Sequence, residues 1–274
     1  MKKHTMLLGW IVLLGIGCGA QDTPKERNEK KQTDSIAPVA DLTQEEKQLV
    51  NLYSDVTRAG MERKDSAELY ASRFADSLNA LVNSHSGSLQ YPFHILRDSS
   101  KVYIETAPGG AFRIYSWDTW TGGTMSYFDG IWQWKSKNGI HHRTPQPENG
   151  DPGNFCSKIY TVNIKGREYY LAILNGIYSS KDVSQSVQAF TIGGDQLIDT
   201  VTIFNTGSKQ LNRIDVNYDF FSVVDRPERP VSLIRYDEKN KALYIPVVND
   251  QGQVTPKHLV YELKEDGFMF RGVE

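Results

Sequence analysis

The sequence predicts a mainly β protein, an antiparallel meander preceded by a short two-helix segment. From about residue 100 onward, apolar residues alternate with a period of two, and glycine- and aspartate-rich turn signals recur at intervals of roughly 10 to 15 residues. Apolar residues at helical spacing are confined to residues 42–88. Because no helical pattern separates the predicted strands, consecutive strands pair antiparallel. The meander is propeller-like or forms a barrel or sandwich, and these alternatives stay open.

Residues 1–17 have the pattern of a secretory leader. The basic start Met1-Lys2-Lys3-His4 precedes an apolar run from Met6 to Ile16, and small residues follow that run. Because a membrane-spanning helix needs about 20 apolar residues, the run is too short to cross a bilayer. We therefore predict a signal peptide and no transmembrane helix in this segment.

The end of the leader, Leu13-Leu14-Gly15-Ile16-Gly17-Cys18, resembles the lipobox of bacterial lipoproteins. In that class the cysteine becomes the lipidated first residue of the mature chain, so the resemblance implies lipidation at Cys18 and an acyl anchor in a cell-envelope membrane. Gly19 takes the place of the aspartate that often signals inner-membrane retention, which favours the outer membrane. Gly15 stands where the class usually has leucine, and cleavage after Ala20 by an ordinary signal peptidase is the alternative.

Residues 18–41 predict a disordered tether between this anchor and the folded part. The segment lacks aromatic residues and is rich in lysine, glutamate, glutamine and aspartate. Such a composition buries too little apolar surface to offset the entropy lost on ordering.

Residues 42–88 predict two helices. Thr43-Gln44-Glu45-Glu46 has the pattern of a capping box, and Asp65-Ser66-Ala67-Glu68 offers a second helix start. Apolar side chains then recur at helical spacing, and we expect these two stripes to be core faces rather than partner-binding faces. They comprise Leu49, Leu52, Tyr53, Val56 and Gly60 in the first helix and Tyr70, Phe74, Leu78 and Leu81 in the second.

Residues 89–274 predict an antiparallel all-β domain of twelve strands. These are Lys101–Thr106, Phe112–Trp117, Met125–Trp134, Lys158–Ile164, Glu168–Leu174, Ser186–Ile192, Leu197–Phe204, Leu211–Phe220, Val231–Tyr236, Ala242–Val248, His258–Leu263 and Gly267–Arg271. The last four are expected to form one four-stranded unit, and Lys158–Phe204 could form another. The Pro- and Gly-rich loop Pro145–Asn154 is expected to be a rim feature or a boundary between sheets.

The stretch Phe112–Trp134 is the candidate centre of the domain because it holds every tryptophan outside the leader. Two aromatic strands flank Thr121–Thr124, which predicts a hairpin with a tight turn. Both strand faces carry large rings, so either the helices cover the outer face or some rings are exposed. Exposed rings beside carboxylates would suit a sugar ligand. The candidate ligand-binding residues are Tyr115, Trp117, Asp118, Trp120, Asp129, Trp132 and Trp134.

Catalysis is the alternative use of the two aspartates in this hairpin. Asp118 and Asp129 could act as the acid and base of a glycoside hydrolase. Aspartates beside glycine-rich turns are more often turn caps, so the sequence leans toward a protein that is not an enzyme.

Composition and motifs exclude several other functions. The formal net charge is −2, and no basic stripe is present, so we expect no nucleic-acid partner. We expect no metal and no cofactor, because His141-His142 on a strand would point to opposite faces and the common cofactor motifs are absent. Cys156 is expected to be a buried core residue. The prediction is a membrane-anchored envelope protein with a binding or assembly role, and a glycan or another envelope protein as its partner.

Overall fold

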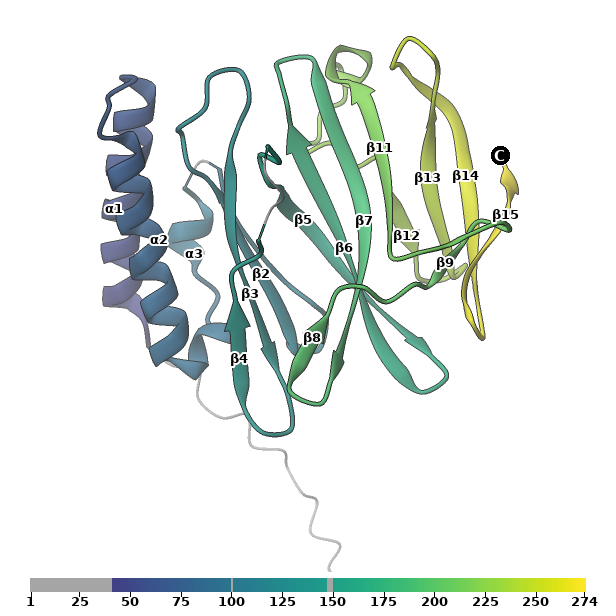
Figure 1. The fold of residues 1–274 in the computed structure, drawn as a ribbon, viewed down its shortest axis with the longest axis horizontal. Helices are drawn as coiled ribbons and strands as arrows, with labels where there is room; N and C mark the ends of the chain where they lie inside the picture. The colour runs from purple at the N-terminus through teal and green to yellow at the C-terminus, as the bar shows by residue number, and fades with distance from the viewer. Residues whose placement is uncertain (1–40, 100, 147–149) are drawn as a thin grey trace, which may run out of the picture. The chain divides into compact units, whose positions relative to one another are not determined.

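The computed structural model describes residues 41–99, 101–146 and 150–274, which all belong to one unit, Val39–Glu274. In this unit a pair of helices and three β-sheets are stacked as successive layers (Figure 1). The predicted leader and tether, with Cys18, lie outside the described residues except for Asp41 at the end of the tether. The mainly β, antiparallel architecture preceded by two helices is confirmed.

The helical layer consists of α1 (Thr43–Met61) and α2 (Ala67–Ser84). Their predicted apolar stripes are the buried faces, and the core residues from them are Leu49, Tyr53, Val56, Phe74, Leu78 and Leu81. Two short helical segments, η1 (Ser86–Leu89) and α3 (His94–Arg97), lead from α2 into the first sheet.

The predicted capping box at the start of α1 is wrong. Leu42, not Thr43, is the N-cap residue, and the Thr43 hydroxyl instead donates to Asp41 Oδ1 at 2.7 Å. The Glu46 carboxylate is buried and points away from the cap. It accepts hydrogen bonds from the Leu96 backbone N–H at 3.0 Å and from the Tyr91 hydroxyl at 2.8 Å. A tertiary hydrogen bond has therefore replaced the local one that the sequence pattern suggests.

The first sheet is an antiparallel meander of four strands in the order β1-β2-β3-β4. The strands are β1 (Val102–Thr106), β2 (Phe112–Asp118), β3 (Phe128–Lys135) and β4 (Ile140–Arg143). The sequence does not predict β4, because Ile-His-His-Arg has no apolar alternation. The predicted pairing of the two aromatic strands is confirmed, with Ile114 opposite Trp132.

The connection between β2 and β3 is wider than the predicted tight hairpin turn. Residues 119–127 separate the two strands, and Trp120 within them adopts a positive φ of 56°. The indole of Trp120 extends toward α1, where its Nε1 donates to the Tyr53 hydroxyl at 3.2 Å. The loop is wide because it seats this tryptophan against the helix.

The second sheet has the strand order β11-β7-β6-β5, with β8 paired to the far end of β7. Its members are β5 (Phe155–Ile164), β6 (Arg167–Ile177), β7 (Asp182–Gly193), β8 (Gln196–Ile198) and β11 (Arg213–Asp219). Loop Pro145–Asn154 connects the first sheet to the second, so the described part of this loop marks a boundary between sheets.

The third sheet has the strand order β10-β9-β15-β14-β13-β12. Its members are β9 (Phe204–Asn205), β10 (Gln210–Leu211), β12 (Arg235–Asp237), β13 (Ala242–Val248), β14 (Val254–Lys264) and β15 (Gly267–Val273). The expected four-stranded unit at the C-terminal end is present as β12 to β15. Strand β9 joins it by a short parallel pairing with β15. A 3₁₀ helix, η2 (Phe220–Val223), follows the second sheet's β11.

Each interface between layers is a separate apolar core. The helices pack on one face of the first sheet, whose core residues there include Tyr115, Trp117 and Ile131. The other face of this sheet packs on the second sheet through Phe112, Ile114 and Trp134. The second sheet then packs on the third. Sheets stacked face to face fit the sandwich alternative, and the described residues contain no closed barrel.

Gly60 near the end of α1 allows the Trp120 loop to approach the helix. A β-carbon at this position would lie 2.3 Å from Trp120 Cβ and 2.6 Å from the Trp120 carbonyl oxygen. We therefore expect Gly60→Ala to destabilise the fold by about 1–3 kcal/mol, despite the better helix propensity of alanine, because backbone atoms must move. The urea midpoint measures this change. Gly123→Ala is the matched control, since a β-carbon added there would have no atom within 4 Å. An unchanged midpoint for Gly60→Ala would contradict the expectation.

Candidate functional site

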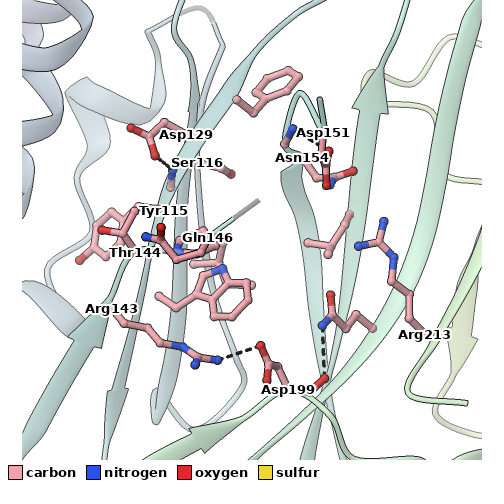
Figure 2. A pocket seen from close by; sticks show the side chains of 18 residues that line it. Tyr115, Ser116, Asp129, Arg143, Thr144, Gln146, Asp151, Asn154, Asp199 and Arg213 are labelled. Carbon is pink, nitrogen blue, oxygen red and sulfur yellow. Dashed lines mark hydrogen bonds and ion pairs between the residues drawn. The ribbon is translucent and has the colours of Figure 1, made fainter. Parts of the chain in front are cut away.

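A cleft of about 380 Å³ lies between the first and second sheets. Its walls come from β2 and β3, from the loop after β4, from β6, β7 and β11, and from Asp199 after β8 (Figure 2). Segments far apart in the chain thus meet around one space. The polar residues that border it are Ser116, Asp129, Arg143, Thr144, Gln146, Asp151, Asn154, Gln188, Asp199 and Arg213.

Two small residues account for the gap between otherwise packed sheets. Along the face of β3 that meets the second sheet, Phe128, Gly130 and Trp132 alternate, and Gly130 contributes no side chain. Gly130 is paired with Ser116 of β2. The Ser116 hydroxyl accepts a hydrogen bond from the Cys156 backbone N–H at 3.0 Å. A glycine beside a serine therefore leaves space between large rings. A β-carbon at Gly130 would lie 2.8 Å from the Tyr115 carbonyl oxygen, so a side chain there is strongly disfavoured.

An ion pair closes one end of the cleft. The Arg143 guanidinium, at the end of β4, pairs with the Asp199 carboxylate, with Nη2 and Oδ2 separated by 2.9 Å (Figure 2). The same guanidinium lies over the Trp132 indole, 4.9 Å from the ring centroid. The Asp199 carbonyl accepts a hydrogen bond from Asn212 at 3.0 Å. These contacts hold Arg143 in one orientation while leaving some of its N–H groups free to bind a ligand.

Two polar atoms of the cleft residues are unpaired. Arg143 Nε and Asn154 Oδ1 are enclosed by protein and have no hydrogen-bond partner among the described residues. Arg143 stands on the first sheet, and Asn154 precedes the first strand of the second sheet (Figure 2). Each unpaired buried donor or acceptor costs about 1–3 kcal/mol, a cost that Trp117 Nε1 and Ser186 Oγ, outside the cleft, also carry.

A carboxylate without a cationic partner lies beside Asn154. Asp151 Oδ1 accepts the Gly153 backbone N–H at 2.9 Å, and among the described residues no lysine or arginine forms an ion pair with Asp151. The Asp151 side chain is exposed and borders the cleft (Figure 2). The second wall of the cleft therefore offers acceptor oxygens, opposite the guanidinium of Arg143 on the first.

Asp129 borders the same cleft, but its carboxylate points away from it (Figure 2). In the register of the sheet Asp129 is paired with Trp117, whose ring belongs to the core under the helices. The Asp129 carboxylate accepts the Gly130 backbone N–H at 2.8 Å, and among the described residues no lysine or arginine forms an ion pair with it. Burial raises the pKa of this carboxyl above its ordinary value, although the hydrogen bond from Gly130 opposes the change.

The structure brings only part of the predicted ligand platform together. Trp132 is the tryptophan of the platform that lines the cleft, and Asp129 and Tyr115 border the cleft from the other face of the sheet. The Tyr115 ring belongs to the core under the helices, where its hydroxyl donates to the Ser88 carbonyl at 2.9 Å. The helices thus cover the outer face of the aromatic strands, which was one of the two alternatives that the sequence left open.

The remaining tryptophans of the platform are packed within the fold. Trp117 is only 1% exposed, against Phe74 of α2. Trp134 is buried and donates through Nε1 to the Asp195 carbonyl at 3.0 Å. Trp120 is half-buried under the Lys101 ammonium, 4.1 Å from the ring centroid.

Asp118 and Asp129 are not brought together. Asp118 pairs in register with Phe128 and Asp129 pairs with Trp117, so the two carboxylates leave opposite faces of the sheet. Asp118 is buried, and its Oδ2 lies 2.6 Å from Lys101 Nζ. Its other oxygen accepts the Trp120 backbone N–H at 2.8 Å. Asp118 therefore has the turn-capping role of the simpler interpretation, and the two aspartates do not form an acid–base pair in the cleft.

Other candidate groups have structural roles. His141 stacks on Trp134 with ring centroids 5.7 Å apart, and its Nε2 lies 2.9 Å from Ser136 Oγ. Cys156 is fully buried in the core between the first two sheets, as predicted, and burial raises the pKa of its thiol. Within the described ranges, no three histidine, cysteine or carboxylate side chains are clustered to hold a metal ion.

Comparison of the chain with protein families and with curated proteins found no match. No family model matches the chain, and no curated protein matches its sequence. In the part of the chain that the structure describes, no helix is both long and apolar enough to cross a membrane.

Among the described residues the Asp129 carboxylate has no ion-pair partner, so we expect removal of its charge to raise the stability of the fold. Its pKa is raised in the fold above its ordinary 3.8, so the folded state loses stability as pH rises through the interval between these two values. We expect Asp129→Asn, whose amide oxygen can still accept from Gly130, to be more stable than the parent at pH 7. The difference should vanish below the ordinary pKa, where both states are protonated. Urea unfolding at pH 7 and pH 3 measures this.

The control for this prediction is Asp118→Asn. This substitution removes the partner of the Lys101 ammonium and should lower the urea midpoint at pH 7. Equal losses of stability at pH 7 for the two variants would show that Asp129 has a structural partner like that of Asp118.

Proposed function

We propose that this chain is a cell-envelope lipoprotein, held to the membrane by an acylated Cys18, whose folded part is a non-catalytic binding module. The lipobox-like end of the leader supports the anchor, and Gly19 supports the outer membrane. The cleft between the first and second sheets is the proposed ligand site. Residues 18–41 then serve as the spacer between the lipid and this site.

The observation that carries the binding role is the set of unsatisfied polar groups around the cleft. Arg143 Nε and Asn154 Oδ1 have no hydrogen-bond partner among the described residues, and the Asp151 carboxylate has no cationic partner there. Nε of Arg143 and Oδ1 of Asn154 are enclosed, so the groups that a ligand can reach are the rest of the Arg143 guanidinium and the exposed Asp151 carboxylate. A ligand that accepts from this guanidinium and donates to this carboxylate, directly or through water, would contact both walls of the cleft. These requirements fit a hydroxyl-rich molecule, and a glycan is the ligand class that we propose.

The arrangement supports binding more than chemistry. Arg143 and Asp199 neutralise one another, and Trp132 has the Arg143 guanidinium over its ring. A sugar would therefore meet the edge of the indole and the row of polar groups rather than an open aromatic face. Such contacts provide orientation and specificity.

The anchor makes a direct prediction in cells. The unaltered chain should fractionate with membranes and take up labelled fatty acid, because the Cys18 thiol is the acylation site. Cys18→Ser should abolish both the label and the membrane association. Cys156→Ser is the matched control, since that thiol is buried in the fold and should have no effect on labelling. A soluble, unlabelled parent chain would refute the anchor.

The ligand proposal predicts a change in tryptophan fluorescence when oligosaccharides bind. Because Trp132 is the tryptophan that lines the cleft, a panel of neutral and amino-sugar oligomers titrated into the purified protein should shift its emission. Trp132→Phe should remove the shift, whereas Trp120→Phe should retain it. Asp151→Asn should weaken binding by about tenfold through loss of a charge-assisted hydrogen bond.

Asp129→Asn is the matched control for the Asp151 variant. Asp129 borders the same cleft, but its carboxylate points away from it, so Asp129→Asn should leave the oligosaccharide affinity within about twofold (Figure 2). If no oligomer gives a saturable shift and the protein instead co-purifies with another envelope protein, the assembly role replaces the glycan role.

A further inference from the structure

A second cavity, of about 490 Å³, has a lining that shares no residue with the cleft. It is bordered by β1, by the wide loop between β2 and β3, by the turn between β6 and β7, and by the segment that follows η2. Parts of the first two sheets and of the chain that leads into the third therefore contribute to it. Its walls combine aromatic rings, serine hydroxyls and two cations.

The charge of this cavity is one-sided. Among its lining residues are the cations Lys101 and Arg229, and none of those residues is an aspartate or glutamate. The Lys101 ammonium is neutralised by Asp118, 2.6 Å away. Arg229 is therefore the group that gives the cavity its net positive charge.

Arg229 is fixed in place without being neutralised. Its Nη1 donates to the carbonyls of Arg226 and Glu228 at 2.5 and 2.7 Å, and its Nη2 donates to the Val224 carbonyl at 2.8 Å. The nearby Glu228 carboxylate lies 3.9 Å from the guanidinium of Arg226, and among the described residues Arg229 has no carboxylate partner. Three of its five N–H groups are used, which leaves two for a ligand.

The walls of the cavity provide an apolar surface and hydroxyl groups. The Tyr103 ring stacks on Phe155 with centroids 4.0 Å apart, and Phe220 lies under the Arg229 guanidinium at 5.5 Å. Burial raises the pKa of Tyr218 to about 12, a rise that the nearby charges of Arg226 and Arg229 oppose. The serines on the walls are Ser126, Ser179, Ser180 and Ser184.

From these features we propose that the second cavity binds a small organic anion with an apolar body, whose anionic head pairs with Arg229 while its body lies against the rings of Tyr103 and Phe220. A preorganised guanidinium with free N–H groups recognises a carboxylate or similar head group. The absence of acidic lining residues removes the repulsion that would oppose such a ligand. This inference does not depend on the glycan proposal, because the two cavities share no lining residue.

Matched amphiphiles test the proposal. Decanoate, decanol and decyltrimethylammonium have the same apolar body and differ in charge, and each is titrated calorimetrically below its micellar concentration into the purified chain carrying Cys18→Ser. Decanoate should bind at one site at least about tenfold more tightly than the other two. Arg229→Gln should reduce decanoate affinity by about tenfold, consistent with loss of one charge-assisted interaction. Arg271→Gln, at an exposed arginine of β15 outside the cavity lining, should leave the affinity within about twofold.

Amide chemical-shift changes in the protein with an unaltered cavity provide a readout that does not depend on any variant there. Decanoate should shift the amide signals of Tyr103, Ser126 and Tyr218 and leave those of Asp129 and Arg143 unchanged. Equal binding of the three amphiphiles, unchanged affinity in Arg229→Gln, or shifts centred on the cleft would each overturn the proposal.

Discussion

The structure depends on covering both faces of strand β2. All seven residues from Phe112 to Asp118 are buried, because the helices cover one face and the second sheet covers the other. Complete burial makes an unpaired polar group on the strand costly, and Trp117 Nε1 is one buried group there without a hydrogen-bond partner among the described residues. Arg113 avoids this cost by donating to the Ser88 and Tyr91 carbonyls at 2.6 Å. These carbonyls and the Thr106 hydroxyl, 2.7 Å from Nε, solvate the buried guanidinium, and the same side chain therefore holds the segment between α2 and the sheet.

This layered arrangement also explains where ligand-sized spaces form. Continuous stacking of large rings would leave none, and the interface between the first two sheets is closed wherever side chains such as Phe112 and Trp134 meet the second sheet. The cleft forms where Ser116 and Gly130 stand side by side on the first sheet. The second cavity forms at the ends of the strands, where packing stops. Both spaces therefore arise where large side chains do not fill the interface between layers.

The sequence predicts the parts of the fold that depend on local patterns. Period-two alternation locates most strands, and helical spacing locates both helices. Local signals fail where a distant contact is stronger: Glu46 bonds to Leu96 instead of capping α1, and Trp120 widens the hairpin turn to reach Tyr53. The cleft is predictable only in part. Arg143 and Asp199 are 56 residues apart, and no spacing rule connects them before the sheets are stacked.

The two cavities differ in charge, and packing alone does not explain the difference. In the cleft the Arg143 guanidinium is neutralised by Asp199, and what remains is hydrogen-bonding capacity together with the exposed Asp151 carboxylate, which has no lysine or arginine partner among the described residues. In the second cavity the three carbonyls that hold Arg229 explain its orientation, but no lining carboxylate balances its charge. Arg229 is exposed, so solvent also stabilises its charge, and the distinguishing feature of the second cavity is a cation in a lining without acidic side chains. A hydroxyl-rich ligand therefore suits the cleft, and an anion suits the second cavity.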